Sequence, residues 1–157
     1  MIGQILAVAV AASAPAQITD PQVRAFVERQ ARAWNAGDLA AYFATFTPQA
    51  RFTDQALGND NRVVLYGVST LAQAHAQARR VFASSQVRET SVITSITIAP
   101  DGRRARVVDN EISEITKGGK LRRVCGHSVA DLVLTPAGLR STGQTDTIVR
   151  CRAGPIG

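Results

Sequence analysis

The spacing of hydrophobic residues changes along the chain, from helical spacing in the first half to strand spacing in the second. Apolar residues of the first half recur every three or four positions, which places them on one face of a helix. Those of the second half follow the alternation of long β-strands. We therefore expect an α+β domain, in which three N-terminal helices pack on a strongly curved antiparallel sheet.

The helix boundaries are marked by capping residues and breakers. Thr19 or Asp20 can cap the first helix, Pro21 suits its first position, and an Asn-Ala-Gly sequence at 35–37 ends it. Asp38 can cap the second helix, which a Thr-Pro pair ends. The second and third helices are expected over residues 39–46 and 69–82.

Turn sequences divide the remaining chain into strands. Two short strands are expected between the second and third helices, over residues 50–54 and 63–66. Four long strands then follow as a meander of three hairpins, with glycine-containing turns between them. These long strands are expected over residues 87–99, 103–116, 121–134 and 139–151.

The N-terminus is expected to be a signal peptide over residues 1–16. A short apolar run at 5–12 precedes Ala14-Pro15-Ala16, a small-residue cleavage site, although no Lys or Arg precedes the run. An apolar tail is the alternative. The run is much shorter than the roughly 20 residues of a membrane-spanning helix. We therefore expect a periplasmic or secreted protein with one domain over 17–157 and no membrane association after leader removal.

Two cysteines, Cys125 and Cys151, lie on the last two expected strands. If these strands form a hairpin, both cysteines lie near its open end. Export would place them in an oxidising compartment, where such a pair forms a disulfide. Two reduced core cysteines are the alternative, because a disulfide requires a specific geometry.

The net charge of +6 comes from dispersed cations. Sixteen of the eighteen are Arg, and they form no run of five or six. Aromatic residues do not alternate with them, as stacking on nucleic-acid bases would require. We therefore expect a dispersed basic surface and no nucleic-acid partner.

Three segments together resemble the nuclear transport factor 2-like (NTF2-like) superfamily, including SnoaL-like and ketosteroid isomerase-like domains. They are AWNAGDLAAYF at 33–43, PQARFTD at 48–54 and Tyr66-Gly67 before the third helix. The resemblance extends from about Ile18 to Cys151. It implies that the sheet forms a cone closed by the helices, with an apolar pocket inside. It does not imply catalysis, because one fold hosts many functions.

The resemblance singles out Asp54 as a general base, since ketosteroid isomerases hold a proton-shuttling carboxylate at this position. The isomerase also needs a tyrosine and a neutral carboxylic acid as donors, and these positions fall on about Gln30 and Ser128. Both donors are thus replaced. Alternatively, Asp54 accepts backbone hydrogen bonds from the loop at 58–61.

Ser128 and His127 are neighbours on one strand, so only one of them can face the cone. The face of Ser128 is the more apolar and is expected inward, which places His127 on the convex face. A β-bulge would reverse this and bring His127 opposite Asp54. Asp109 and Glu111 share one strand face; they form either an acid/base pair or cross-strand ion pairs with Arg123 and Arg122.

Several residues are expected to contact a ligand, and the aromatic ones also to form the core between helices and sheet. These ligand-binding candidates are Gln30, Trp34, Phe52, Tyr66 and Phe82. The two histidines are far apart and no zinc-ligand spacing occurs, so no metal is expected. No cofactor-binding motif is present either.

Three functions remain open. The first is an exported domain that binds a small apolar molecule, or a protein partner, without catalysis. The second is a SnoaL-like or ketosteroid isomerase-like enzyme, of isomerase, cyclase or hydrolase type, with Asp54 as general base and Ser128 or Gln30 orienting the substrate. The third is assembly as a homodimer across the outer sheet face, expected to carry Val107, Val129 and Val133.

Overall fold

A computed structural model describes residues 17–152, so the expected signal peptide at 1–16 lies outside the described residues. Three helices precede four long strands, and two further strands lie between the second and third helices. The elements are α1 (Asp20–Asn35), α2 (Leu39–Phe43), β1 (Phe46–Leu57), β2 (Val63–Thr70), α3 (Leu71–Ser84), β3 (Gln86–Ile98), β4 (Arg104–Lys117), β5 (Lys120–Thr135) and β6 (Gly138–Val149).

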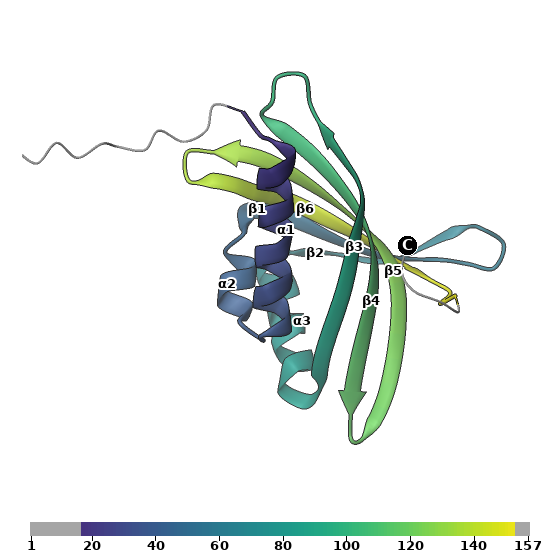
Figure 1. Cartoon of the computed structure of the whole chain (residues 1–157). Coiled ribbons are helices and arrows are strands. Elements are labelled where there is room, and N and C mark those ends of the chain that lie inside the picture. The colour runs from purple at the N-terminus through teal and green to yellow at the C-terminus, as the bar shows by residue number, and fades with distance from the viewer. Residues whose placement is uncertain (1–16, 153–157) are drawn as a thin grey trace, which may run out of the picture.

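The strands form one six-stranded sheet in the order β2-β1-β6-β5-β4-β3. The sheet is strongly curved, and all three helices lie on its concave side (Figure 1). The four C-terminal strands form the expected meander of antiparallel hairpins. The predicted α+β architecture with a curved sheet is therefore confirmed.

The expectation of a purely antiparallel sheet was wrong, because β1 and β6 run parallel. Residues 46–56 of β1 pair with residues 141–148 of β6 in the same direction. No hairpin joins these strands, since the rest of the chain lies between them. Turn sequences therefore carry no information about their relative direction.

The second helix is shorter, and the following strand longer, than predicted. The helix ends at Phe43, and β1 begins at Phe46 rather than at residue 50. The backbone N–H of Ser141 donates to the carbonyl of Thr45 at 2.9 Å, just before β1 starts. Pairing with β6 thus extends this segment. The apolar spacing of Phe43 and Phe46 alone does not distinguish the two conformations.

Two apolar clusters hold the helices against the sheet. The first lies between α1 and one end of the sheet and contains Ile18, Val23, Phe26, Ala105, Val107, Leu132, Leu134 and Leu139. The second joins α2, α3 and β1 and contains Leu39, Phe43, Phe46, Ala50, Phe52 and Ala78. Val107 is 2% exposed within the first cluster, so its predicted place on the outer face was wrong.

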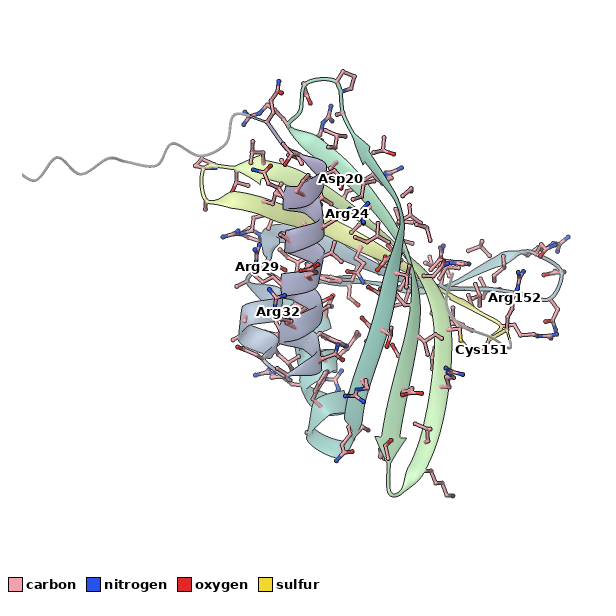
Figure 2. All side chains as sticks on the ribbon, in the orientation of Figure 1. Asp20, Arg24, Arg29, Arg32, Cys151 and Arg152 are labelled. Carbon is pink, nitrogen blue, oxygen red and sulfur yellow. A yellow bond between two sulfur atoms is a disulfide. The ribbon has the colours of Figure 1, made fainter. Side chains whose placement is uncertain are left out.

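Cys125 and Cys151 form a disulfide in the structure. Figure 2 shows Cys151 and Arg152 beside the projecting β1–β2 hairpin, on the opposite side of the sheet from Arg24 and Arg32 of α1. The disulfide thus joins β5 to the segment that follows β6.

The end of the β1–β2 hairpin projects beyond the sheet and is the most exposed apolar part of the described chain (Figure 1). Tyr66 is 66% exposed there, so its expected place in the core was wrong. Strand β2 lies at the edge of the sheet, and β1 is the only strand paired with it among residues 17–152. The exposed apolar residues of this arm are Leu57, Val63, Val64, Leu65, Tyr66 and Val68.

None of the helices described is both long enough and apolar enough to cross a membrane.

Candidate functional site

A row of polar side chains crosses the concave face of the sheet over four strands. Asp54 of β1 pairs with Asp146 of β6, Asp146 with Ser128 of β5, and Ser128 with Asp109 of β4. Residues that pair across neighbouring strands point to the same face and lie about 5 Å apart. The row therefore places three carboxyl groups and a hydroxyl together.

Two further carboxyl groups extend this row toward the hairpin between β4 and β5. Glu111 follows Asp109 by two residues on β4 and so shares its face. Ser113 comes next on that face, and its hydroxyl donates to Glu89 of β3 at 2.9 Å. We call Glu89, Asp109, Glu111 and Asp146 the carboxyl wall.

The most extensively hydrogen-bonded member of the wall is Asp146. The side-chain amide of Gln144 donates to both of its carboxylate oxygens, at 2.8 and 3.1 Å. Burial raises the pKa of Asp146, although the hydrogen bonds from Gln144 and Ser128 oppose the rise; the charge of Asp54 adds to it. Asp146 is therefore more easily protonated than an ordinary aspartate.

Asp109 lies at the apolar end of the wall, and 8% of the residue is exposed. Burial raises the pKa of Asp109 to about 6; a hydrogen bond with Ser91 opposes the rise, and the charge of Asp146 adds to it. A large part of this group is consequently protonated near pH 6.

The two glutamates of the wall also have raised pKa values, and burial is the largest cause for each. Burial raises the pKa of Glu111, and the charges of Glu89, Asp146 and Asp109 raise it further. Burial also raises the pKa of Glu89, against the hydrogen bond from Ser113. Like charges this close are not all ionised together. At neutral pH the wall therefore carries protonated carboxyl groups, which can donate hydrogen bonds.

The helices place aromatic side chains opposite the wall. Tyr42 packs against Trp34, with ring centroids 4.8 Å apart. Burial raises the pKa of the Tyr42 hydroxyl well above its ordinary value, and the charge of Asp146 is the next largest cause. The indole Nε1 of Trp34 is buried and has no hydrogen-bond partner among the described residues. A donor is thus available on the helical side.

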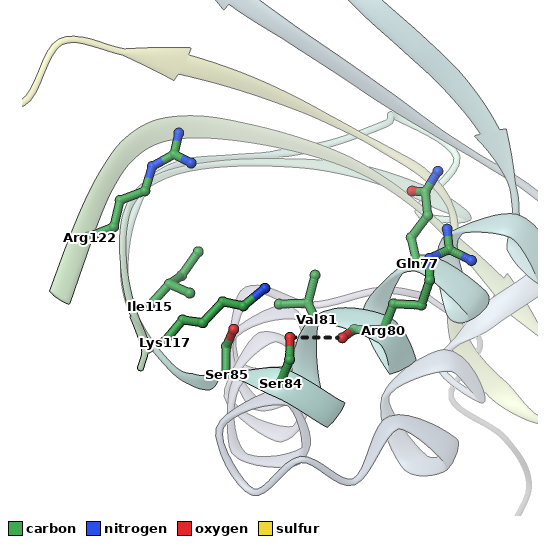
Figure 3. A pocket seen from close by; sticks show the side chains of 8 residues that line it. All are labelled: Gln77, Arg80, Val81, Ser84, Ser85, Ile115, Lys117 and Arg122. Carbon is green, nitrogen blue, oxygen red and sulfur yellow. Dashed lines mark hydrogen bonds between the residues drawn. The ribbon is translucent and has the colours of Figure 1, made fainter. Parts of the chain in front are cut away.

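An open hollow of about 460 Å³ lies between the end of α3 and the β4–β5 hairpin (Figure 3). Its residues come from α3, from the segment after it and from the facing ends of β4 and β5. They are Gln77, Arg80, Val81, Ser84, Ser85, Ile115, Lys117 and Arg122. Ile115 follows Glu111 and Ser113 on the same strand face, so the hollow continues the carboxyl wall.

The three predicted catalytic residues lie in different environments. Asp54 is exposed, and partial burial of its carboxyl raises its pKa. Ser128 is 3% exposed on the inward face, where its strand was expected to direct it. His127 lies on the convex face, and its Nδ1 is 2.5 Å from Asn110 Oδ1. No bulge interrupts the β4–β5 pairing, so His127 is not opposite Asp54.

Among the predicted ligand contacts, Tyr66 lies on the arm, apart from the wall. The Gln30 amide donates to the Thr45 hydroxyl at 2.8 Å. Phe52 is buried, and the rings of Trp34 and Phe82 meet edge to face with centroids 4.9 Å apart. These side chains thus fill the space between helices and sheet.

The predicted cross-strand pairs of Asp109 and Glu111 with Arg123 and Arg122 were wrong. Arg123 pairs with Glu114, and Arg122 pairs with Ile115. The two acids instead pair with Ser128 and Gly126 on the concave side. The register of the hairpin turn decides this, and it places the arginines several residues closer to the turn.

Sequence reasoning missed Glu89 and Asp146. Both lie on the concave face of the sheet, because Glu89 pairs with Ser113 and Asp146 pairs with Ser128. Regular alternation through the turn, where Leu134 pairs with Leu139, would have assigned Asp146 to the outer face. The register shift between Asp131 and Leu132 is what brings Asp146 opposite Ser128. No local motif marks Glu89, which depends on the β3–β4 register.

Among residues 17–152, no group of three His, Cys, Asp or Glu side chains is arranged to hold a metal ion.

The sequence matches no family model and no curated protein, but the structure is similar to solved structures. A conserved protein from Planctomyces limnophilus aligns with a TM-score of 0.70 at 14% identity, over 83% of this chain and 95% of that one. A ketosteroid isomerase-like protein from Erwinia carotovora atroseptica aligns with a TM-score of 0.64 at 13% identity, over 83% and 96%.

An NTF2-like protein from Novosphingobium aromaticivorans aligns with a TM-score of 0.62 at 14% identity, over 85% of this chain and 83% of that one. At these identities the similarity concerns the fold. The order of the helices, the curved sheet and the structural neighbours agree with the resemblance seen in the sequence. The chain therefore has the fold of the NTF2-like superfamily.

Proposed function

We propose that the cone binds a small molecule whose hydrogen-bond acceptors meet the carboxyl wall. The observation that carries this proposal is the gathering of four carboxyl groups with raised pKa on one concave face, next to an open hollow. Pockets with a few convergent polar groups are typical ligand sites. The wall favours a ligand with carbonyl or similar acceptors over a purely apolar one.

The protonation of the wall determines which ligands suit it. Burying an ionised carboxylate is very costly, so such groups take up protons instead. A protonated carboxyl group offers one O–H donor, and ketosteroid isomerases keep a buried acid neutral for this purpose. A carbonyl oxygen placed against Glu111 or Asp109 would receive such a bond.

Binding can be tested with prodan, an uncharged fluorescent naphthyl ketone whose emission shifts to longer wavelength when its carbonyl accepts a hydrogen bond. We expect prodan to bind and to report a hydrogen-bonded carbonyl. Ser113→Phe fills the concave face between Glu111 and Ile115 and should weaken binding at least about tenfold. Thr116→Phe adds the same ring to the opposite face of β4 and should leave binding within about twofold.

Equal affinity of the two phenylalanine variants would show that prodan binds elsewhere, with the exposed arm as the obvious site. That result, or no binding to the wild-type protein, would contradict the proposal. Circular dichroism of both variants establishes that the fold is retained.

A second candidate function is proton transfer at a carbon next to a carbonyl. Asp54 and Asp146 pair across neighbouring strands, one exposed and the other half-buried. Two carboxyl groups in such different environments can act as base and acid. Asp54 would take the proton from carbon, and protonated Asp146 would donate a hydrogen bond to the enolate oxygen. In ketosteroid isomerases the donor is an acid at the position that corresponds to about Ser128. Here Asp146, the neighbour of Ser128 on β6, would supply the hydrogen-bond donor instead.

Proton transfer can be measured by NMR as exchange of the α-protons of prodan in deuterated buffer. We expect exchange faster than in buffer, and we expect Asp54→Asn to abolish the increase while prodan affinity stays within about twofold. Asp60→Asn, on the exposed β1–β2 loop, is the matched control. Exchange at the buffer rate with wild-type protein would leave a binding function without catalysis.

We also propose that the protein is exported to the periplasm or secreted. The expected leader and the Cys125–Cys151 disulfide support this, because disulfides persist in oxidising compartments. Cell fractionation together with thiol alkylation tests the proposal. Export predicts a mature chain that begins near Gln17 and has no free thiol; a cytoplasmic, fully alkylated chain would contradict it.

A further inference from the structure

Three cations surround the hollow at the open side of the carboxyl wall. Figure 3 shows Arg80 on α3 and Lys117 and Arg122 on the facing hairpin, with the hollow between them. We call these three residues the basic mouth. All three are exposed, so their charged groups are accessible to a ligand.

The basic mouth and the carboxyl wall lie on the same face of the sheet. Lys117 follows Glu111 on β4 by an even number of residues, and Arg122 of β5 pairs with Ile115 of β4. A molecule that enters the hollow therefore meets the cations first and the carboxyl groups further in. The side chains along this surface therefore change from basic to acidic over a few strand residues.

The cations of the basic mouth are available for an external anion. The residues that line the hollow include no Asp or Glu. The ion pairs found among residues 17–152 join Arg24 to Asp20, Arg32 to Glu28, Arg62 to Asp60 and Arg106 to Asp131. None of them involves the basic mouth.

We infer that the ligand of the cone is an amphiphilic organic anion, with its carboxylate at the basic mouth and an uncharged acceptor against the carboxyl wall. This inference rests on the function proposed above. A carboxylate placed deeper would meet buried acids and lose its hydration, whereas at the mouth it stays hydrated and close to three cations. The positions of the cations and the carboxyl groups thus favour an anionic ligand and determine which end of it lies at the basic mouth.

A bulk effect of the net charge of +6 is the competing explanation for any anion binding. The chain provides a matched control, because each mouth cation has a near neighbour in sequence that does not line the hollow. The mouth triple variant carries Arg80→Gln, Lys117→Gln and Arg122→Gln. The control triple variant carries Arg79→Gln, Lys120→Gln and Arg123→Gln, and has the same net charge.

The experiment compares prodan with its succinyl analogue, 4-[6-(dimethylamino)naphthalen-2-yl]-4-oxobutanoate, which has the same fluorophore and ketone and adds a carboxylate. We expect the mouth triple to weaken binding of the analogue about tenfold or more, as three exposed charge contacts together would. The control triple should change it by less than about twofold. Prodan affinity should stay within about twofold in both variants.

Equal weakening of the analogue by both triple variants, or no weakening by the mouth triple, would overturn the inference. Both results leave the proposed function intact if prodan still binds and Ser113→Phe still weakens it. Loss of prodan binding in the wild-type protein would instead contradict the proposed function, and the inference with it.

Discussion

The two ends of the concave face of β4 differ: one end is part of the apolar core, and the other carries the carboxyl groups of the candidate site. On β4, Ala105 and Val107 are buried in the apolar cluster under α1. Asp109 and Glu111 follow on the same face, with the same alternation, and form the carboxyl wall. Neighbouring β5 repeats the change, from Leu132 in the cluster to Ser128 in the polar row.

The helices account for the difference. Val23 and Phe26 of α1 are almost fully buried against the apolar end of the face. Further along, Tyr42 and Trp34 bring polar groups to the helical side. Strand alternation therefore decides which face a residue occupies, and the covering helix decides whether that position is core or site.

The largest effect is expected from moving a carboxyl group into the apolar end. Val107→Asp places an acid where Phe26 and Leu132 leave it no polar partner, and should destabilise the domain by about 4 kcal/mol or more. Urea unfolding measures this. Val108→Asp, on the outer face of the same strand, should cost clearly less. Similar losses for both variants would show that the two faces do not differ as described.

The converse change removes a charge from the carboxyl wall. The folded pKa of Asp109 is about 6, above its ordinary value of 3.8. Below about pH 4 Asp109 is protonated in both the folded and the unfolded chain, and its contribution to the free energy of unfolding is fully present. As the pH rises toward 6 and beyond, this contribution is lost because the unfolded chain ionises first. Asp109→Asn should remove this loss, gaining up to about 3 kcal/mol at pH 8 relative to pH 4.

Urea unfolding of the wild type and Asp109→Asn at several pH values checks this prediction. Asp131→Asn, on the convex face, is the control and should leave the pH dependence between 4 and 8 nearly unchanged. A wild-type stability that increases over this range would contradict the raised pKa values of the wall.

The smallest effect is expected at the aromatic side of the cone. Trp34→Phe retains a ring against Tyr42 and Phe82 and removes an Nε1–H that has no partner in the described structure. No hydrogen bond is lost, so the free energy of unfolding should change by less than about 1.5 kcal/mol. Thermal unfolding measures it. A substantially larger loss would contradict this prediction.

Local signals in the sequence were enough to predict most of the fold. The capping residues and helical spacing correctly indicated α1 and α3, and the glycine-containing turns marked the four long strands to within a few residues. Such signals can be recognised in a sequence because caps, turns and alternation depend on nearby residues only. The inward face of β5, with Ser128, followed from the same alternation.

The combination of these elements into a site depends on tertiary structure alone. The parallel β1–β6 pair brings Asp54 beside Asp146, although most of the chain separates them. The registers of β3, β4 and β5 place Glu89 and Glu111 on the wall, and Lys117 and Arg122 at its mouth. Pairing between distant strands depends on packing and on hydrogen bonds across the whole sheet. The raised pKa values arise in turn from burial, which exists only once the sheet has curved around the helices.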